Sequence, residues 1–126
     1  MRSVVLLFAS TVLAGRALAA QQAPALPEGV TPAMIEEGGK LFKGAGMCAA
    51  CHGVSATGGV GPSLADTAWL HSKGTFEEIA RQITAGVPQA QAKGGMMMPP
   101  RGGSAISDAQ VRAVAAYVWS LSHPAK

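Results

Sequence analysis

Large aromatic side chains are scarce in this chain of 126 residues, which has three Phe, one Tyr and two Trp. Gly, in contrast, occurs 16 times. A domain of this size buries only a modest core, and so few large side chains exclude a core built mainly from aromatic packing. The composition favours a fold in which a large apolar cofactor fills the middle.

Clusters of Lys or Arg are also missing, and the chain has a single long apolar run, Val4 to Ala14. Residues 21–126 contain eight Lys and Arg and seven Asp and Glu, which gives a net charge of +1. This balance argues against nucleic acid and against an anionic membrane surface as partners. The apolar run is shorter than the about 20 residues of a membrane-spanning helix, so we expect no transmembrane span after the leader is removed.

The first 20 residues have the three parts of a secretory signal peptide. Arg2 gives a positive start, the apolar run follows, and Ala17-Leu18-Ala19 is a small-x-small cleavage site. Cleavage after Ala19 or after Ala20 fits equally well, and an uncleaved anchor is the alternative reading. We therefore expect residues 1–20 to direct export to the periplasm.

The rest of the chain is expected to form a flexible Pro-rich arm at residues 21–30 and one domain at residues 31–126. Capping residues and apolar residues at helical spacing predict three main helices in that domain. No segment alternates like a half-buried strand, so the predicted fold class is all-α with long loops, including a short turn or helix at Thr67 to Leu70. The three helices are predicted to begin after Thr31, Thr75 and Ser107 and to end at Gly44, Gly86 and His123.

The only two Cys residues lie three apart and are followed directly by a His, in Cys48-Ala49-Ala50-Cys51-His52. Two thiols at this spacing can reach the two vinyl groups of one haem and form thioethers, and the next imidazole can bind its iron. The motif therefore predicts one covalent haem c on Cys48 and Cys51, with His52 as the proximal iron ligand.

Three other readings of the motif are weaker. A redox-active dithiol is typical of a βαβ context, which this sequence lacks. A structural zinc site needs four ligands, and no second Cys/His pair occurs at a suitable spacing. A plain disulfide is compatible with an exported protein but leaves His52 unexplained.

An iron-binding His usually donates its second ring N–H to a fixed acceptor. The backbone carbonyl of Pro62, in Gly61-Pro62-Ser63-Leu64, is the predicted acceptor; the alternative, compatible with it, is that Pro62 stiffens a loop.

The sixth iron ligand is predicted in Met96-Met97-Met98-Pro99-Pro100. A thioether is a soft ligand that raises the haem potential, and the two Pro residues hold the loop rigid. Met98 is the first choice and Met97 the second, while gap-filling in the core is the ordinary use of Met. His71 and His123 are alternative ligands that we expect to face solvent.

These motifs together resemble the monohaem class I cytochrome c family over nearly all of residues 31–123, and in particular its oxidase-associated haem domains. Gly38 with Phe42, and the run Val114 to Val118, look like the first-helix and last-helix signatures of that family. The resemblance implies that these two helices cross, with the small Gly allowing close approach. Trp69 and Arg101 are candidate donors to the haem propionates; the alternatives are a core or rim aromatic for Trp69 and a solvated surface charge for Arg101.

A haem iron with His and Met on its two faces has no open position for a substrate, which suits electron transfer rather than catalysis. The sequence therefore predicts a periplasmic one-electron carrier that is not itself an enzyme. Its expected partners are redox proteins: a quinol-oxidising complex or dehydrogenase as donor and a terminal oxidase or reductase as acceptor. Alternatives are a fixed haem subunit of a dehydrogenase or oxidase complex, and a five-coordinate haem protein that binds a gas or peroxide. The chain is expected to be a monomer or a complex subunit.

Overall fold

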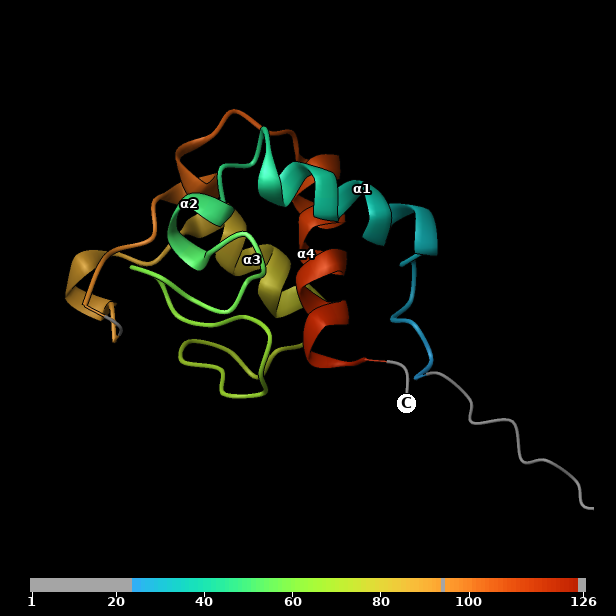
Figure 1. Cartoon of the computed structure of the whole chain (residues 1–126), viewed down its shortest axis with the longest axis horizontal. Helices are drawn as coiled ribbons and strands as arrows, with labels where there is room; N and C mark the ends of the chain where they lie inside the picture. Colours follow the sequence, from blue (N-terminus) through green and yellow to red (C-terminus); the bar gives the residue numbers. More distant parts are fainter. Residues whose placement is uncertain (1–23, 94, 125–126) are drawn as a thin grey trace, which may run out of the picture.

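The computed structural model describes residues 24–93 and 95–124, so the predicted signal peptide and the start of the arm lie outside the described residues. Figure 1 shows α1 crossing α4, with α3 beside α4 and the long loops on one side of these helices. Within the described part the helices are α1 (Pro32–Lys43), α2 (Ala49–His52), α3 (Phe76–Ala85) and α4 (Asp108–Ser122), and two 3₁₀ turns occupy Gln89–Gln91 and Pro100–Gly103.

The three main helices begin where the capping patterns predict. Thr31 Oγ1 accepts a hydrogen bond from the Met34 amide at 3.2 Å, and Pro32 occupies the first turn of α1, where its missing N–H costs nothing. Thr75 and Ser107 each form a complete capping box at the start of α3 and α4. Because these bonds are local, the sequence determines them without reference to the rest of the fold.

The crossing of α1 and α4 depends on Gly38. This residue is buried against Ala113 and Tyr117, and a Cβ placed on it would lie 2.9 Å from the Tyr117 Cβ and closer still to the Ala113 carbonyl oxygen. One turn further along α1, the fully buried Phe42 meets the Tyr117 ring with a centroid distance of 5.4 Å. The two helices can therefore approach closely only because one of them lacks a side chain at the contact point.

Arg112 joins α4 to α3. Its guanidinium bonds the Glu77 carboxylate at 3.0 and 3.2 Å and lies 4.7 Å from the centre of the Phe76 ring. The hydrogen bond from Arg112 is the main cause that holds the pKa of Glu77 below its usual value of 4.5.

This lowered pKa predicts how stability depends on pH. A carboxyl group with a lowered pKa in the folded state contributes stability above its ordinary pKa and loses that contribution as pH falls through the folded value. We therefore expect Glu77→Gln to lower the free energy of unfolding at neutral pH and to approach the wild type as the pH falls through the lowered pKa of Glu77. Urea unfolding across this range measures the difference, and Glu37→Gln on the exposed side of α1 is the control. A difference that does not shrink in acid would contradict the prediction.

The structure differs from the sequence expectations in the loops. The segment from Thr67 to Leu70 is not helical: bends at Thr67 and Leu70 flank irregular backbone, and the Asp66 carboxylate accepts the Ala68 amide at 2.8 Å in a local turn. At the end of the predicted flexible arm, Val30 is buried in the core, and its amide bonds the Pro27 carbonyl.

No helix within residues 24–93 and 95–124 combines the length and the apolar character needed to cross a membrane.

Candidate functional site

The short helix α2 brings the three reactive side chains of the motif to one side of the chain. Cys48 caps this single turn, and its carbonyl accepts hydrogen bonds from the amides of Cys51 and His52 at 3.2 and 3.0 Å. Positions i, i+3 and i+4 of a helical turn share a face. The spacing of the motif therefore places two thiols and one imidazole on a common surface.

Cys48 and Cys51 are not joined in a disulfide. Burial raises the pKa of the Cys48 thiol, which donates a hydrogen bond to the Gly46 carbonyl at 3.3 Å. A redox-active dithiol instead requires a lowered thiol pKa. Within residues 24–93 and 95–124, no three His, Cys, Asp or Glu side chains are arranged to hold a bare metal ion. These findings disfavour the dithiol and zinc readings.

The loop after α2 turns back and supports the imidazole of His52. The Gly61 amide bonds the Cys51 carbonyl at 2.9 Å, and the Pro62 carbonyl oxygen lies 2.8 Å from His52 Nδ1. Since a carbonyl can only accept, Nδ1 carries the proton, and Nε2 is free to bind a metal. A Cβ on Gly61 would lie 3.1 Å from the ring, so this close return of the loop favours Gly.

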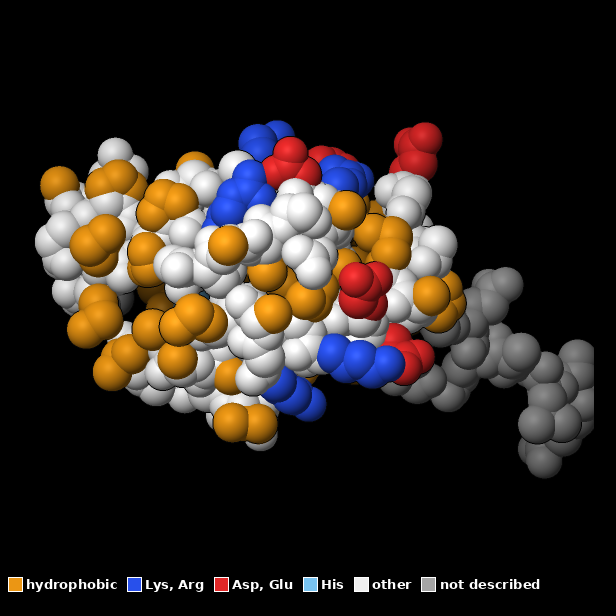
Figure 2. Space-filling view, turned by 90° about the horizontal axis from the view of Figure 1, so that it is seen from above, with side chains coloured by type: hydrophobic (Ala, Val, Ile, Leu, Met, Phe, Trp, Pro, Cys, Tyr) orange, Lys and Arg blue, Asp and Glu red, His pale blue; other side chains and the backbone are white. Residues whose placement is uncertain are grey.

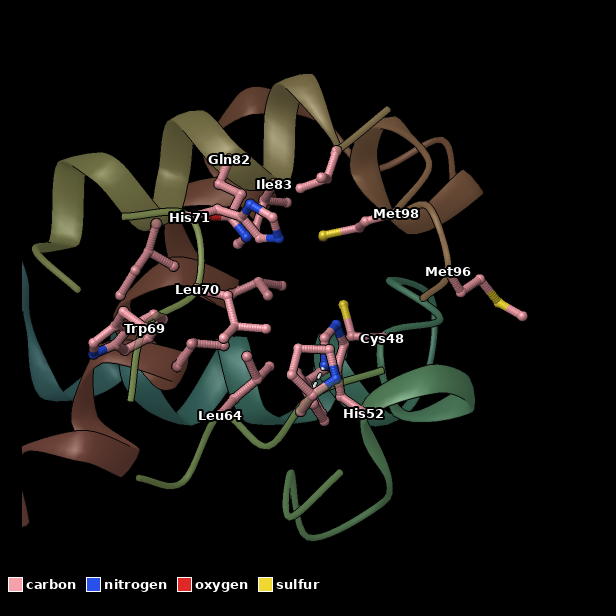
Figure 3. A pocket seen from close by; sticks show the side chains of 16 residues that line it. Cys48, His52, Leu64, Trp69, Leu70, His71, Gln82, Ile83, Met96 and Met98 are labelled. Carbon is pink, nitrogen blue, oxygen red and sulfur yellow. Dashed lines mark hydrogen bonds between the residues drawn. The ribbon is translucent and has the colours of Figure 1, made fainter. Parts of the chain in front are cut away.

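Met98 faces His52 from the other side of the same cavity. Figure 3 shows the Met98 sulfur pointing into the cavity opposite His52, whereas the Met96 sulfur points away from it. An isolated antiparallel bridge joins Met98 to Val87 through backbone bonds of 2.8 and 3.0 Å, which fixes its main chain. Met96 and Met97 are 56% and 46% exposed, while Met98 is partly buried. Of the three Met residues, Met98 is best placed to reach a bound iron.

The cavity between these residues fits a haem by its donor set and its walls. Its empty volume is about 700 Å³, which includes its open mouth. Thiol, imidazole and thioether groups line it, and no charged side chain does. The remaining lining is apolar apart from His71, Gln82 and the indole of Trp69: Phe42, Pro62, Leu64, Leu70, Ile79, Ile83, Val87, Met96, Val114 and Val118.

His71 and Gln82 line this cavity although the sequence analysis did not place them there. We expected His71 to face solvent. Nothing in the sequence pointed to Gln82 as a cavity residue except its position beside Ile83 on α3. Figure 3 shows the imidazole of His71 pointing into the cavity on the side of α3 and Met98. The residue is exposed as a whole because the cavity opens next to it. His71 is thus exposed, as expected, and its imidazole also lines the open side of the cavity.

Of the two residues considered for the propionates, one lines the cavity and the other does not. Trp69 lines the cavity, with its indole nitrogen against Gly74. The guanidinium of Arg101 donates to the Ile106 carbonyl at 2.7 Å and pairs with Asp108 at the start of α4, and it does not line the cavity. The remaining alternative ligand, His123, stacks on Trp119 with ring centroids 4.3 Å apart and is also outside the lining.

Comparison with known proteins places this arrangement in a family. The family described as cytochrome c oxidase, cbb3-type, subunit III matches residues 33–118. The chain is 39% identical over 92 residues to the cbb3-type oxidase subunit CcoP of Rubrivivax gelatinosus, covering 72% of this chain and 27% of that protein. It is 40% identical over 76 residues to subunit FixP of Azorhizobium caulinodans, covering 60% of this chain and 26% of that protein. The chain thus spans about a quarter of the length of these relatives.

Two solved structures share the fold. Cytochrome cL of Methylophaga aminisulfidivorans superposes with a TM-score of 0.55 at 24% identity, over 71% of this chain and 53% of that one. Cytochrome cL of Hyphomicrobium denitrificans gives 0.52 at 26% identity, over 68% of this chain and 45% of that one. The chain therefore belongs to the cbb3-type cytochrome c oxidase subunit III family, as a class I cytochrome c domain whose covalent c-type haem serves electron transfer.

Proposed function

We propose that this domain holds one haem through thioethers to Cys48 and Cys51, with His52 and Met98 as its two axial ligands. The observation that carries the proposal is the position of His52 and Met98 on opposite sides of one apolar cavity that Cys48 also lines. A haem bound in this way supplies a reversible one-electron change at its iron. Since the protein fills both axial positions, the domain acts as an electron carrier rather than as an enzyme on its own.

The work of the polypeptide is to hold these ligands in a fixed and largely dry shell. His52 is 8% exposed and is held by the Pro62 carbonyl, and the main chain of Met98 is held by Val87. Ligands that keep their positions when the charge changes lower the reorganisation needed for electron transfer.

The mouth of the cavity is the proposed route for electrons. Exposed apolar side chains of Met47, Val60, Met96 and Met97 line the adjoining hollow that also contains Cys51. In Figure 2 hydrophobic side chains gather at the left end of the molecule, and the visible charged side chains lie over its middle and right. An apolar rim of this kind suits the small and short-lived interfaces of redox partners.

The experiment that tests haem attachment is removal of both thiols. We expect the Cys48→Ser/Cys51→Ser variant to lose all its colour on acid extraction, because no thioether is left to hold the porphyrin. The wild type should keep its haem under the same conditions, and so should Met97→Ala, which removes a different sulfur from the same rim. Haem staining after denaturing electrophoresis gives the measurement. A wild-type chain that loses its haem on extraction would refute the proposal.

We propose the periplasm as the site of action, supported by the leader-like residues 1–20. The partners are redox proteins: a quinol-oxidising complex or dehydrogenase as donor and a terminal oxidase or reductase as acceptor. The oxidase-subunit relatives favour the second reading, a haem subunit fixed in an oxidase complex. Gel filtration of a native periplasmic extract separates a free carrier, which elutes near its own mass, from a subunit of a complex.

A further inference from the structure

The distal side of the cavity contains a second group that can bind iron. The imidazole of His71 points into the cavity on the same side as Met98 and opposite His52 (Figure 3). Among the residues that line the cavity, His52 and His71 are the two imidazoles, and the proposed function uses only the first.

We propose that His71 is a reserve sixth ligand, which binds the haem iron when the Met98 sulfur is not available. This inference rests on the proposed ligation by His52 and Met98. The exchange breaks an iron–sulfur bond and forms an iron–nitrogen bond with a neutral imidazole, so no electron or proton is transferred. Its effect is to keep the sixth position closed to small molecules such as carbon monoxide or peroxide.

Ligand chemistry makes the exchange favourable once Met98 is removed. Imidazole is a good ligand for iron in both oxidation states, whereas a thioether is soft and weakly basic. Without Met98, the other two Met residues offer only the same weak type of ligand from exposed positions. His71 is then the stronger candidate among the groups on that side of the cavity.

Positioning explains why Met98 holds the site in the intact protein. Its backbone bonds to Val87 through both N–H and C=O, so its sulfur is presented with little loss of conformational entropy. His71 instead lies in the stretch between α2 and α3, which has no helix or strand and carries exposed side chains at positions 70 and 71. Fixing this stretch so that His71 binds iron costs conformational entropy. The Met98 loop does not pay this cost, because its backbone is already held by Val87.

Two contacts hold the loop around His71 close to the cavity. The Glu78 carboxylate accepts the Lys73 amide at 3.0 Å, and the Trp69 ring packs against Gly74. These contacts hold the loop on both sides of His71. The geometry therefore keeps the imidazole near the distal side of the cavity.

The test compares three haem-loaded proteins: Met98→Ala, Met98→Ala/His71→Ala and Met98→Ala/His123→Ala. His123 is the matched control because its ring is stacked on Trp119 and lies outside the cavity lining. Absorption and electron paramagnetic resonance spectra report the spin state of the iron, and stopped flow with the reduced proteins reports carbon monoxide binding.

We expect Met98→Ala and its His123→Ala derivative to stay low-spin with nitrogen ligands on both faces. The His71→Ala derivative should be high-spin and bind carbon monoxide at least about tenfold faster, since no ligand has to leave first. Free imidazole should return it to the low-spin state. Met98→Ala/His71→Gln should show the same high-spin state and fast carbon monoxide binding as Met98→Ala/His71→Ala. Far-UV circular dichroism checks that both of these proteins are folded.

Two results would overturn the inference. The first is a high-spin Met98→Ala protein although His71 is present, and the second is a low-spin state that survives the loss of His71. Both are distinct from failure of the proposed function, which would show as a wild-type protein without covalent haem or without the iron–sulfur absorption band. That failure would remove this inference as well.

Discussion

Replacing Met98 by Ala is expected to abolish the weak iron–sulfur absorption band of the oxidised protein and to lower its reduction potential by on the order of 0.1 V. A thioether stabilises the reduced iron, and axial ligands can set haem potentials over a span of about 0.8 V. Whatever group then fills the sixth position, the sulfur contribution is lost. Spectroscopy and a potentiometric titration of the same sample measure both effects.

The two neighbouring Met residues provide matched controls for this result. Met96→Ala and Met97→Ala remove the same side chain from exposed positions of the same loop, so both variants should keep the band and nearly the wild-type potential. Persistence of the band in Met98→Ala, or its loss in Met97→Ala, would move the ligand to another residue. Of these two results, loss of the band in Met97→Ala would identify Met97, the second choice from the sequence, as the ligand.

Replacing Gly38 by Ala is expected to destabilise the fold by about 3 kcal/mol or more, because the new methyl group must displace the backbone of α4. The added Cβ would overlap the Ala113 carbonyl oxygen and lie 2.9 Å from the Tyr117 Cβ. Neither atom belongs to a flexible side-chain end that can swing aside. Denaturant unfolding of the haem-loaded protein measures the loss.

Gly39→Ala is the control for the change in helix propensity, which favours Ala over Gly by about 1 kcal/mol at both sites. A Cβ on Gly39 would lie 3.3 Å from ring atoms of Tyr117, which a small tilt of the ring relieves. This variant should remain within about 1 kcal/mol of the wild type. Equal stability of the Gly38 and Gly39 variants would show that α1 and α4 are not held at the distance seen in the structure.

Features with local causes were predictable from the sequence. The starts of α1, α3 and α4 follow from side chains that bond amides three residues away, as Thr75 and Ser107 do in their capping boxes. The spacing of Cys48, Cys51 and His52 fixes their shared face within one helical turn. The hydrogen bond from His52 to the Pro62 carbonyl spans only ten residues and was also expected.

Features that depend on distant contacts were decided by the tertiary structure. Three consecutive Met residues look alike in sequence, but in the structure the backbone of Met98 is paired with Val87 and its sulfur points into the cavity, whereas the Met96 sulfur points away. From the sequence, Arg101 was a candidate donor to a haem propionate. In the structure its guanidinium instead bonds the Asp108 carboxylate and the Ile106 carbonyl.

What the sequence determined by itself was the type of cofactor, the helices, and the spacing that puts Cys48, Cys51 and His52 on one face, because short-range bonding encodes these features. What the structure decided was which of several chemically equivalent side chains point into the cavity: the Met98 sulfur rather than that of Met96, and the His71 imidazole rather than that of His123. The physical reason is that side-chain direction at a shared site is set by packing between segments far apart in the chain.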